Sequence, residues 1–241
     1  MIYAHSANVN GDWHPLAEHL LCVSRLATDF AANTTWRNEA ALAGLLHDLG
    51  KYADRFQARL KGQDSGLDHW SQGAWVALDK EHHAIAASLA IQGHHVGLQR
   101  ADLDSLRRMN PQNLTQNHPF GLALSDADHL KLKQRAEAEG LLFHTPAQTA
   151  LSPKNGMAQA VANMLDVRLL FSCLVDADFL DTEAHFEGDA QGKRPRPDGP
   201  KLDASAALAA LDAHMAKLRS ATGAQAEVRQ AREVLWSATE R

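Results

Sequence analysis

The sequence contains little cysteine and no long apolar run, and each absence excludes a class of protein. Its two cysteines, Cys22 and Cys173, cannot form a disulfide framework and lie among apolar residues, which excludes a disulfide-rich secreted fold and favours a reducing compartment. No apolar run approaches the roughly 20 residues that cross a bilayer. The start of the chain, Met1 to His5, has no basic stretch followed by an apolar one. The sequence therefore predicts a cytoplasmic protein with no membrane partner.

Three common catalytic or metal-binding motifs are also missing. The sequence has no Gly-rich phosphate loop, no Gly-x-Ser-x-Gly elbow and no Cys-x-x-Cys pair, so P-loop hydrolases, serine esterases and zinc ribbons lack their parts. The formal net charge is −5. No general positive field therefore attracts nucleic acid, and any binding of a polyanion must depend on local patches or on bound metal.

Histidine is the residue type that the chain has in unusual number. There are 14 histidines in 241 residues, and half of them lie between His19 and His95. The 45% hydrophobic content is enough for one large or two small domains with a real core. A folded protein with clustered histidines indicates metal chemistry.

His47 and Asp48 stand side by side at the end of an apolar helix that we predict over residues 38–47. Successive helical positions lie about 100° apart, so an imidazole nitrogen and a carboxylate oxygen can lean toward one point. Such ligands suit a divalent ion. An isolated pair could equally be a helix-end histidine favoured by the helix dipole and a solvated aspartate. Gly50 is predicted to end the helix as a left-handed cap.

A second pair of adjacent ligands, His94 and His95, follows a helix predicted over residues 81–93. Two neutral imidazoles suit transition ions. A further ligand could be His69, beside the predicted helix cap Asp68, or His83. In one continuous helix, His83 would lie about 16 Å of helical rise from His94, so His69 is favoured.

His19 and a late pair of aspartates are further candidates. His19 lies on the apolar stripe of a helix that Pro15 opens, where it could be a core residue or a ligand. Asp176 and Asp178 belong to a helix predicted over residues 155–182, which we expect to be central and buried. Two residues apart, these aspartates point to nearly opposite sides, so only one can reach a shared site.

The ordered set of these residues resembles the HD superfamily of metal-dependent phosphohydrolases, and more narrowly the HD nuclease domain of type I CRISPR systems. The resemblance covers residues 3 to about 183. The segments that carry it are Tyr3-Ala4-His5-Ser6, Gly44 to Lys51, Asp68-His69 with Gly73-Ala74, Gly93 to Gly97, and Leu174 to Asp178.

The resemblance implies an all-α fold, an HD-domain helical bundle with a metal site at converging helix ends. The domain would span residues 1–183. A basic loop rich in Pro and Gly would follow at 184–203, including the run from Lys193 to Arg196, which could touch nucleic acid or be a solvated loop. Helices at 204–241 would pack on the same domain or lead to a helicase that is absent from this chain.

The resemblance also implies two divalent ions, which could be Mn, Ni, Co, Fe or Mg. One ion would be held by His19, His47, Asp48 and Asp178, and the other by Asp48, His69, His94 and His95. Asp178 is preferred to Asp176 because a small residue, Ala177, precedes it. The catalytic residues would be Asp48, which bridges the ions, and Lys51, which would lie near the scissile phosphate.

The expected activity is hydrolysis of DNA phosphodiester bonds, preferably in single strands, in CRISPR antiviral defence. The expected partners are a helicase and the RNA-guided surveillance complex. Two alternatives stay open. The same ligands would serve an HD phosphohydrolase that acts on free dNTPs or cyclic nucleotides, and a non-catalytic recruitment module could hold purely structural metals.

Overall fold

The computed structural model describes residues 1–100, 102–151, 156–188, 201, 203–220 and 226–239. The chain divides into two compact units, Met1–Pro195 and Arg196–Arg241. The basic run from Lys193 to Arg196 lies outside the described residues. The described part is mostly helical with few and very short strands, which confirms the predicted all-α class.

The first unit contains all of the candidate ligands. It begins with an antiparallel pair, β1 (Tyr3–His5) and β2 (His14–Pro15). There follow α1 (Leu16–Phe30), α2 (Arg37–Leu46), the 3₁₀ helix η1 (Leu49–Tyr52) and α3 (Asp54–Leu60). The parallel pair β3 (Leu67–Asp68) and β4 (Ala123–Leu124) brackets α4 (Ser71–Leu78), α5 (Ile85–Gly93), α6 (Leu103–Arg108) and α7 (Pro111–Gln116). The unit ends with α8 (His129–Ala138) and α9 (Met157–Glu187).

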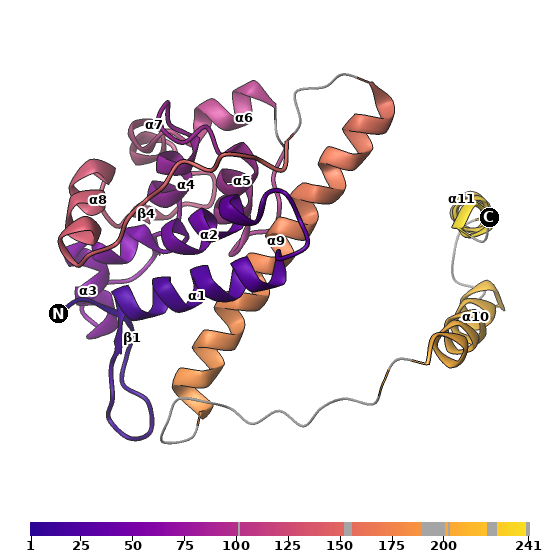
Figure 1. Cartoon of the computed structure of the whole chain (residues 1–241), viewed down its shortest axis with the longest axis horizontal. Coiled ribbons are helices and arrows are strands. Elements are labelled where there is room, and N and C mark those ends of the chain that lie inside the picture. The colour runs from indigo at the N-terminus through magenta and orange to yellow at the C-terminus, as the bar shows by residue number, and fades with distance from the viewer. Residues whose placement is uncertain (101, 152–155, 189–200, 202, 221–225, 240–241) are drawn as a thin grey trace. The chain divides into compact units, whose positions relative to one another are not determined.

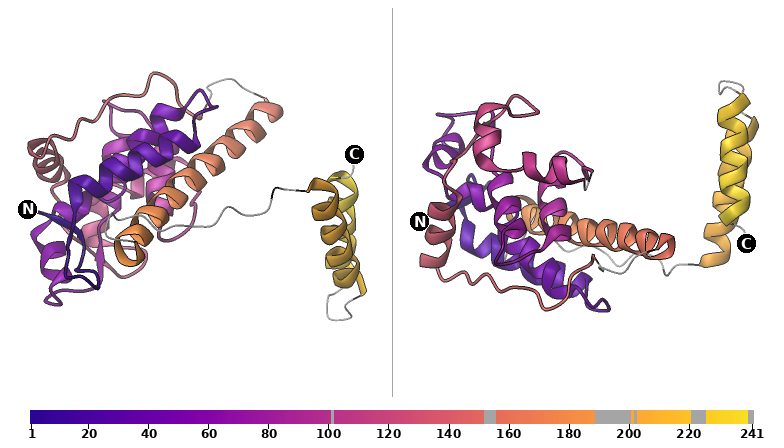
Figure 2. Two further views of the ribbon diagram at one scale, coloured as in Figure 1. Left: turned by 60° about the horizontal axis from the view of Figure 1, so that its bottom comes forward. Right: turned by 90° about the horizontal axis from the view of Figure 1, so that it is seen from above.

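The core lies where α1, α2, α5 and α9 meet (Figures 1 and 2). Pro15 stands at the N-cap of α1, as predicted, since its fixed φ suits a helix start. Apolar residues at helical spacing then give α1 one buried face. The fully buried side chains of these helices include Leu16, Leu20, Val23, Leu42, Leu46, Ile91, Leu170 and Leu174.

Small residues let α1 and α2 approach each other closely. A Cβ atom on Gly44 would lie 2.5 Å from the Cα of Ser24, a distance that real Cβ atoms do not adopt. The absence of a side chain at Gly44 therefore permits the close packing of these two helices. This packing sets the end of α2, with its His-Asp pair, beside His19 of α1.

Gly50 does not act as a left-handed cap, and that prediction was wrong. It lies inside η1, and its backbone N–H donates to the carbonyl of His69 at 2.9 Å. A Cβ atom at this position would collide with the His69 carbonyl and lie 2.6 Å from Gln72 Oε1. Glycine is needed here because two backbone segments that carry candidate ligands nearly touch.

The helix predicted over residues 81–93 begins only at Ile85, so His82 and His83 lie in the segment before it. His83 has a φ of +49° and precedes α5, which begins at Ile85. His69 lies two residues before α4, which begins at Ser71. The N-cap of α4 is Trp70 and not Asp68 as predicted, although Asp68 Oδ1 accepts the N–H groups of Trp70 and Ser71, both at 3.0 Å, just before the helix.

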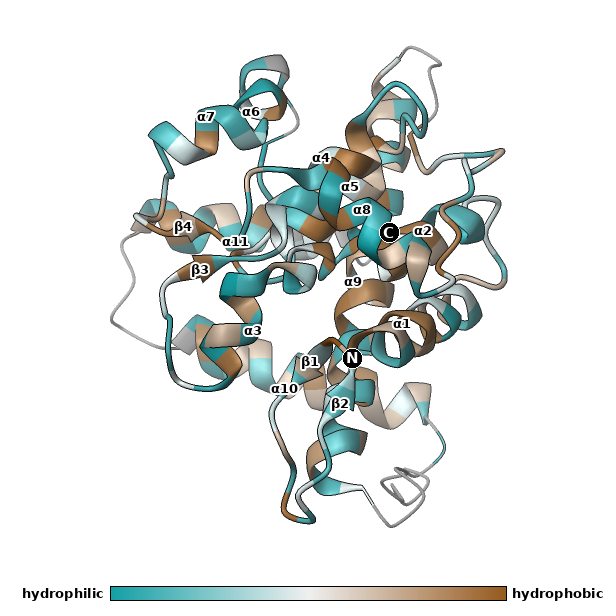
Figure 3. Ribbon diagram, turned by 90° about the vertical axis from the view of Figure 1, so that its left-hand side faces the viewer, coloured by the Kyte–Doolittle hydropathy of each residue, from teal (hydrophilic) through white to brown (hydrophobic). Residues whose placement is uncertain are grey.

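The late helix α9 is buried on one face only, which corrects the expectation of a central helix buried all round. Leu170, Leu174, Ala177 and Asp181 are its buried residues, whereas Phe179 is 71% exposed. Hydropathy varies from residue to residue along the ribbon (Figure 3). Apolar composition alone does not predict which face of a helix packs against other helices.

By length and composition α9 could also cross a membrane, unlike any other helix in the described part of the chain. Its most apolar window has a mean hydropathy of 1.4. The expectation that no segment approaches this length is therefore wrong by that measure. One such helix is weak evidence for a span, and α9 packs against α1 and α5.

The second unit contains α10 (Ala204–Ser220) and α11 (Ala226–Thr239). The two helices are joined by an ion pair between Arg219 Nε and Glu233 Oε1 at 2.6 Å. Most of their side chains are exposed within this unit.

Candidate metal centre

The two adjacent ligand pairs lie at helix ends and use the same local geometry. His47 follows the last residue of α2, and its Nδ1 lies 2.8 Å from the carbonyl of Gly44. His94 follows α5, and its Nδ1 lies 2.7 Å from the carbonyl of Ile91. A carbonyl oxygen can only accept a hydrogen bond, so each Nδ1 carries a proton and is the donor. Each Nε2 is therefore left as a lone-pair donor for a cation.

The first group of ligands joins three helices at one point. The residues His19, His47, Asp48 and Asp178 each offer one ligand atom, and these atoms all lie within 4.8 Å of one another. His19 Nε2 is 3.2 Å from His47 Nε2 and 3.3 Å from Asp48 Oδ2. Asp178 Oδ1 is 3.5 Å from His19 Nε2.

The second group shares Asp48 with the first. Asp48, His69 and His95 again offer ligand atoms within 4.8 Å of one another. Asp48 Oδ1 lies 3.3 Å from His69 Nε2 and 3.8 Å from His94 Nε2. The two oxygens of one carboxylate thus face different sets of histidines.

Two orphaned polar atoms show that these residues fit a metal. Asp48 Oδ1 and His94 Nε2 are buried and have no hydrogen-bond partner among the described residues. Such atoms are costly unless they bind something. Imidazole nitrogens and carboxylate oxygens are ligands for borderline and hard divalent ions.

Electrostatics in the first group also favour a cation. Burial by itself lowers the pKa of His47, but the carboxylates of Asp48 and Asp178 outweigh it and raise the pKa to about 10. Burial raises the pKa of Asp48, but Lys51 and His47 hold it well below its usual range. The pocket therefore keeps its carboxylates ionised, and the field that favours a proton on His47 also favours a metal ion.

The histidines of the second group are held neutral. Burial lowers the pKa of His69, and burial together with the neighbouring His94 lowers the pKa of His95 to about 3. A neutral imidazole is the form that binds metal. Both rings are therefore ready to bind at neutral pH without losing a proton.

Lys51 lies beside the shared carboxylate. Its Nζ is 2.6 Å from Asp48 Oδ2, and only 5% of the residue is exposed. The pair follows from the turn of η1, which separates the two residues by three positions. Lys51 thus places a positive charge at the inner edge of both ligand groups.

Asp181 is a residue of this centre that the sequence did not reveal. Its Oδ2 lies 2.6 Å from His19 Nδ1 and accepts a hydrogen bond from the Nδ1–H group. The Nε2 atom of His19 is therefore left free to bind a metal ion. The signal in the sequence was its spacing. Asp181 follows Asp178 by three residues, which places both on one face of α9.

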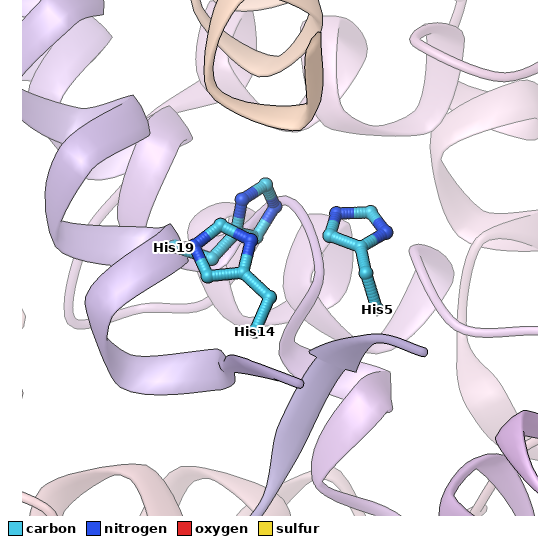
Figure 4. A group of neighbouring side chains, drawn as sticks. All are labelled: His5, His14 and His19. Carbon is cyan, nitrogen blue, oxygen red and sulfur yellow. The ribbon is translucent and has the colours of Figure 1, made fainter. Parts of the chain in front are cut away.

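Three further histidines gather beside His19 and were not assigned a role. Figure 4 shows His5 and His14 next to His19. The rings of His5 and His14 are stacked with centroids 5.6 Å apart, and His185 stacks on His14 at 4.7 Å. Burial lowers the pKa of His5 to about 2 and that of His14 to about 4, so both rings are neutral.

Two of the alternatives raised by the sequence lie away from the centre. Asp176 is exposed on α9, whereas Asp178 faces His19 and His47. His83 is exposed before α5 and belongs to neither group of ligand atoms. The structure therefore brings together His19, His47, Asp48, Lys51, His69, His94, His95 and Asp178.

Comparison with known proteins agrees with this geometry. Residues 16–132 match the model of a family described as HD domain, a region that includes every ligand above except Asp178. A search of curated proteins found no match. The match supports the HD metal-dependent phosphohydrolase superfamily, and it implies divalent metal binding and metal-dependent phosphohydrolase activity in general.

Proposed function

We propose that this protein is a two-metal nuclease that hydrolyses phosphodiester bonds of DNA, preferably in single strands. The observation that carries the proposal is the position of Asp48. One of its oxygens faces His19 and His47, and the other faces His69 and His94. A carboxylate can share its oxygens between two ions about 4 Å apart, as in enzymes that displace groups at phosphate.

The residues divide into two sets of ligands around this carboxylate. His19, His47 and Asp178 would hold one divalent ion with Asp48, while His69, His94 and His95 would hold the other. When bound, the ions would lower the pKa of water and neutralise charge on the phosphate. Lys51, 2.6 Å from Asp48 Oδ2, would orient the shared carboxylate and add a positive charge beside the phosphate.

The shape of the site favours a flexible strand. A cavity of about 330 Å³ opens over Lys51, His69 and His95. A single strand can bend a phosphate into such a cavity, whereas duplex DNA, with a persistence length of about 50 nm, resists bending. The net charge of −5 also argues against a broad surface that grips a duplex.

The order of the motifs along the sequence supports a place in CRISPR antiviral interference. In such a system a helicase, recruited to an RNA-guided surveillance complex, would deliver the single strand. The nuclease itself would then need neither ATP nor strong affinity for DNA. We propose a cytoplasmic location on the same grounds, and either Mn, Ni, Co, Fe or Mg as the ions.

The test is incubation with circular single-stranded DNA under a panel of divalent ions, without ATP. Cleavage is expected with at least one ion, and blunt linear duplex should be cut far more slowly. Asp48→Ala should abolish cleavage, because both ligand groups lose their shared member. His83→Ala, which alters a histidine outside both groups, should cleave like the parent.

Two outcomes would replace the proposal. Turnover of free dNTPs or cyclic nucleotides without cleavage of DNA would identify a nucleotide phosphohydrolase. Tight metal binding without hydrolysis of any of these substrates would identify a recruitment module with structural metals.

A further inference from the structure

The cavity over the metal centre has an unbalanced charge. It is lined by Ala4, His5, Ser6, Lys51, Phe56, Arg59, Leu60, His69 and His95. Two of these residues, Lys51 and Arg59, are basic, and none of the described lining residues carries a carboxylate. Since Lys51 is paired with Asp48 beneath the cavity, Arg59 supplies the remaining charge. A cavity of this kind suits an anion.

Arg59 is exposed yet held in place. Its guanidinium lies over the ring of Phe56, 5.4 Å from the centroid, and Phe56 is itself only 3% exposed. The Nζ of Lys51 lies 5.5 Å from the same centroid. The Phe56 ring therefore lies within cation–π distance of both cations, and this contact favours the present position of Arg59 and reduces the entropy that it would lose on binding a ligand.

A second arginine on the same helix has protein partners and therefore a structural role. Arg55, four residues earlier on α3, pairs with Asp64 at 2.9 Å and donates to the Leu124 carbonyl at 3.2 Å. Arg59, by contrast, forms no ion pair with any residue that the structure describes. The two arginines thus differ in partner but not in charge or helix.

We propose that Arg59 binds a phosphate of the substrate strand, next to the phosphate that is hydrolysed. The proposal rests on the nuclease function above and defines its substrate class more narrowly as a chain with at least two phosphates. A guanidinium suits this role because its planar donors match two phosphate oxygens at once. The flanking phosphate would then fix the register of the strand over the ligands.

Binding is tested without catalysis, by fluorescence anisotropy of a labelled oligothymidine in the presence of a chelator. Arg59→Ala should bind about tenfold more weakly, and the slope of log affinity against log salt should fall by about 0.7, the value for one lost contact to a single strand. Arg59→Lys should keep the slope because it keeps the charge. Arg55→Ala, the matched control, should change neither quantity.

Kinetics separates this proposal from the function on which it rests. Arg59→Ala should raise KM for an oligonucleotide about tenfold and leave hydrolysis of bis(p-nitrophenyl) phosphate, which has one phosphate, unchanged. If the parent cuts oligonucleotides and Arg59→Ala matches Arg55→Ala in KM and in affinity, Arg59 is not a phosphate ligand. If the parent hydrolyses neither substrate, the nuclease function is wrong, and the anisotropy measurement still decides the role of Arg59.

Discussion

At the scale of single residues, His19 depends on Asp181 for its tautomer. The carboxylate oxygen lies 2.6 Å from His19 Nδ1 and 3.6 Å from His14 Nε2. Burial raises the pKa of Asp181, but the hydrogen bond and the charge of His19, together with Cys22 and His14, keep the pKa below its usual range. Asp181 is thus a charged acceptor that holds the ring in position, and it is a positioning residue because it acts through His19.

Asp181→Asn should lower the affinity for a divalent ion by about 10- to 100-fold, the usual effect of removing a partner of a ligating histidine. The amide lacks the negative charge that makes His19 a stronger base. Isothermal titration with Mn²⁺ measures the change. Asp176→Asn, an exposed position on the same helix, is the control, and equal losses in both variants would contradict this role.

The residues alone indicated the adjacent ligand pairs, the family resemblance added His19, His69 and Asp178, and neither assigned a role to the further side chains beside His19. His47-Asp48 and His94-His95 are adjacent pairs at helix ends, so their geometry follows from the helix alone. His5, His14 and Asp181 come from β1, β2 and α9, and nothing local indicates that these elements meet. The clues in the sequence were the three-residue spacing from Asp178 to Asp181 and the place of His5 in a segment that carries the family resemblance.

At the scale of elements, Gly50 allows η1 to lie against the turn that carries His69. Gly50→Ala should lower the free energy of unfolding by about 1–3 kcal/mol, as expected for overpacking, and should weaken metal binding, because Asp48 and His69 lie on the two segments that would move apart. Urea unfolding and isothermal titration measure these effects.

Gly62→Ala is the control for that substitution. Gly62 lies at a turn, its φ is +73°, and a Cβ atom there would meet nothing within 4 Å. In this variant the strained backbone should lower the free energy of unfolding, and the metal affinity should be unchanged. Loss of metal affinity in Gly62→Ala as well would indicate a general effect of instability and not the contact at Gly50.

The start of α4 should make stability depend on pH. The carboxylate of Asp68 accepts hydrogen bonds from the Ser71 hydroxyl at 2.6 Å and from His118 Nε2 at 2.8 Å. Burial raises its pKa, but His118 and Ser71 hold the pKa below its usual range. A lowered folded pKa stabilises the protein above the unfolded value, about 3.9, and this contribution is lost as pH falls through the folded value.

Asp68→Asn should therefore cost about 1–3 kcal/mol above pH 5, and the difference from the parent should shrink below about pH 4. Denaturant unfolding at a series of pH values in a chelator measures it. Asp104→Asn, which alters an exposed aspartate in a pair with Arg107, should cost little at any pH. A difference for Asp68→Asn that grows toward acid would reverse the assigned sign.

The course of α9 shows why some elements could not be predicted. Its composition indicated a helix, and a helix is present over Met157–Glu187. The apolar residues surround the helix almost evenly, so their pattern does not select a buried face. Burial was decided by α1 and α5, which cover Leu170 and Leu174 and leave Phe179 exposed.

At the scale of the whole molecule, the ligands come from five regions of the first unit that are far apart in sequence. His19 lies on α1, His47 and Asp48 follow α2, and Asp178 lies on α9. Their convergence therefore requires the folded arrangement of these helices. Because a site of this kind does not exist in the unfolded chain, metal binding adds directly to the free energy of folding.

Removing the ions should consequently destabilise the first unit. Ionised Asp48 and Asp178 would then lie near each other without a metal ion between them, and the Asp48 Oδ1 and His94 Nε2 atoms would stay buried without a partner. An ion at about 100 times its Kd contributes about 2.7 kcal/mol, so chelation should lower the midpoint of thermal unfolding by about 5–10 °C. Asp48→Ala should have a lower midpoint that responds little to the chelator. An equal midpoint for the parent with and without chelator would mean that no ion is held by these residues.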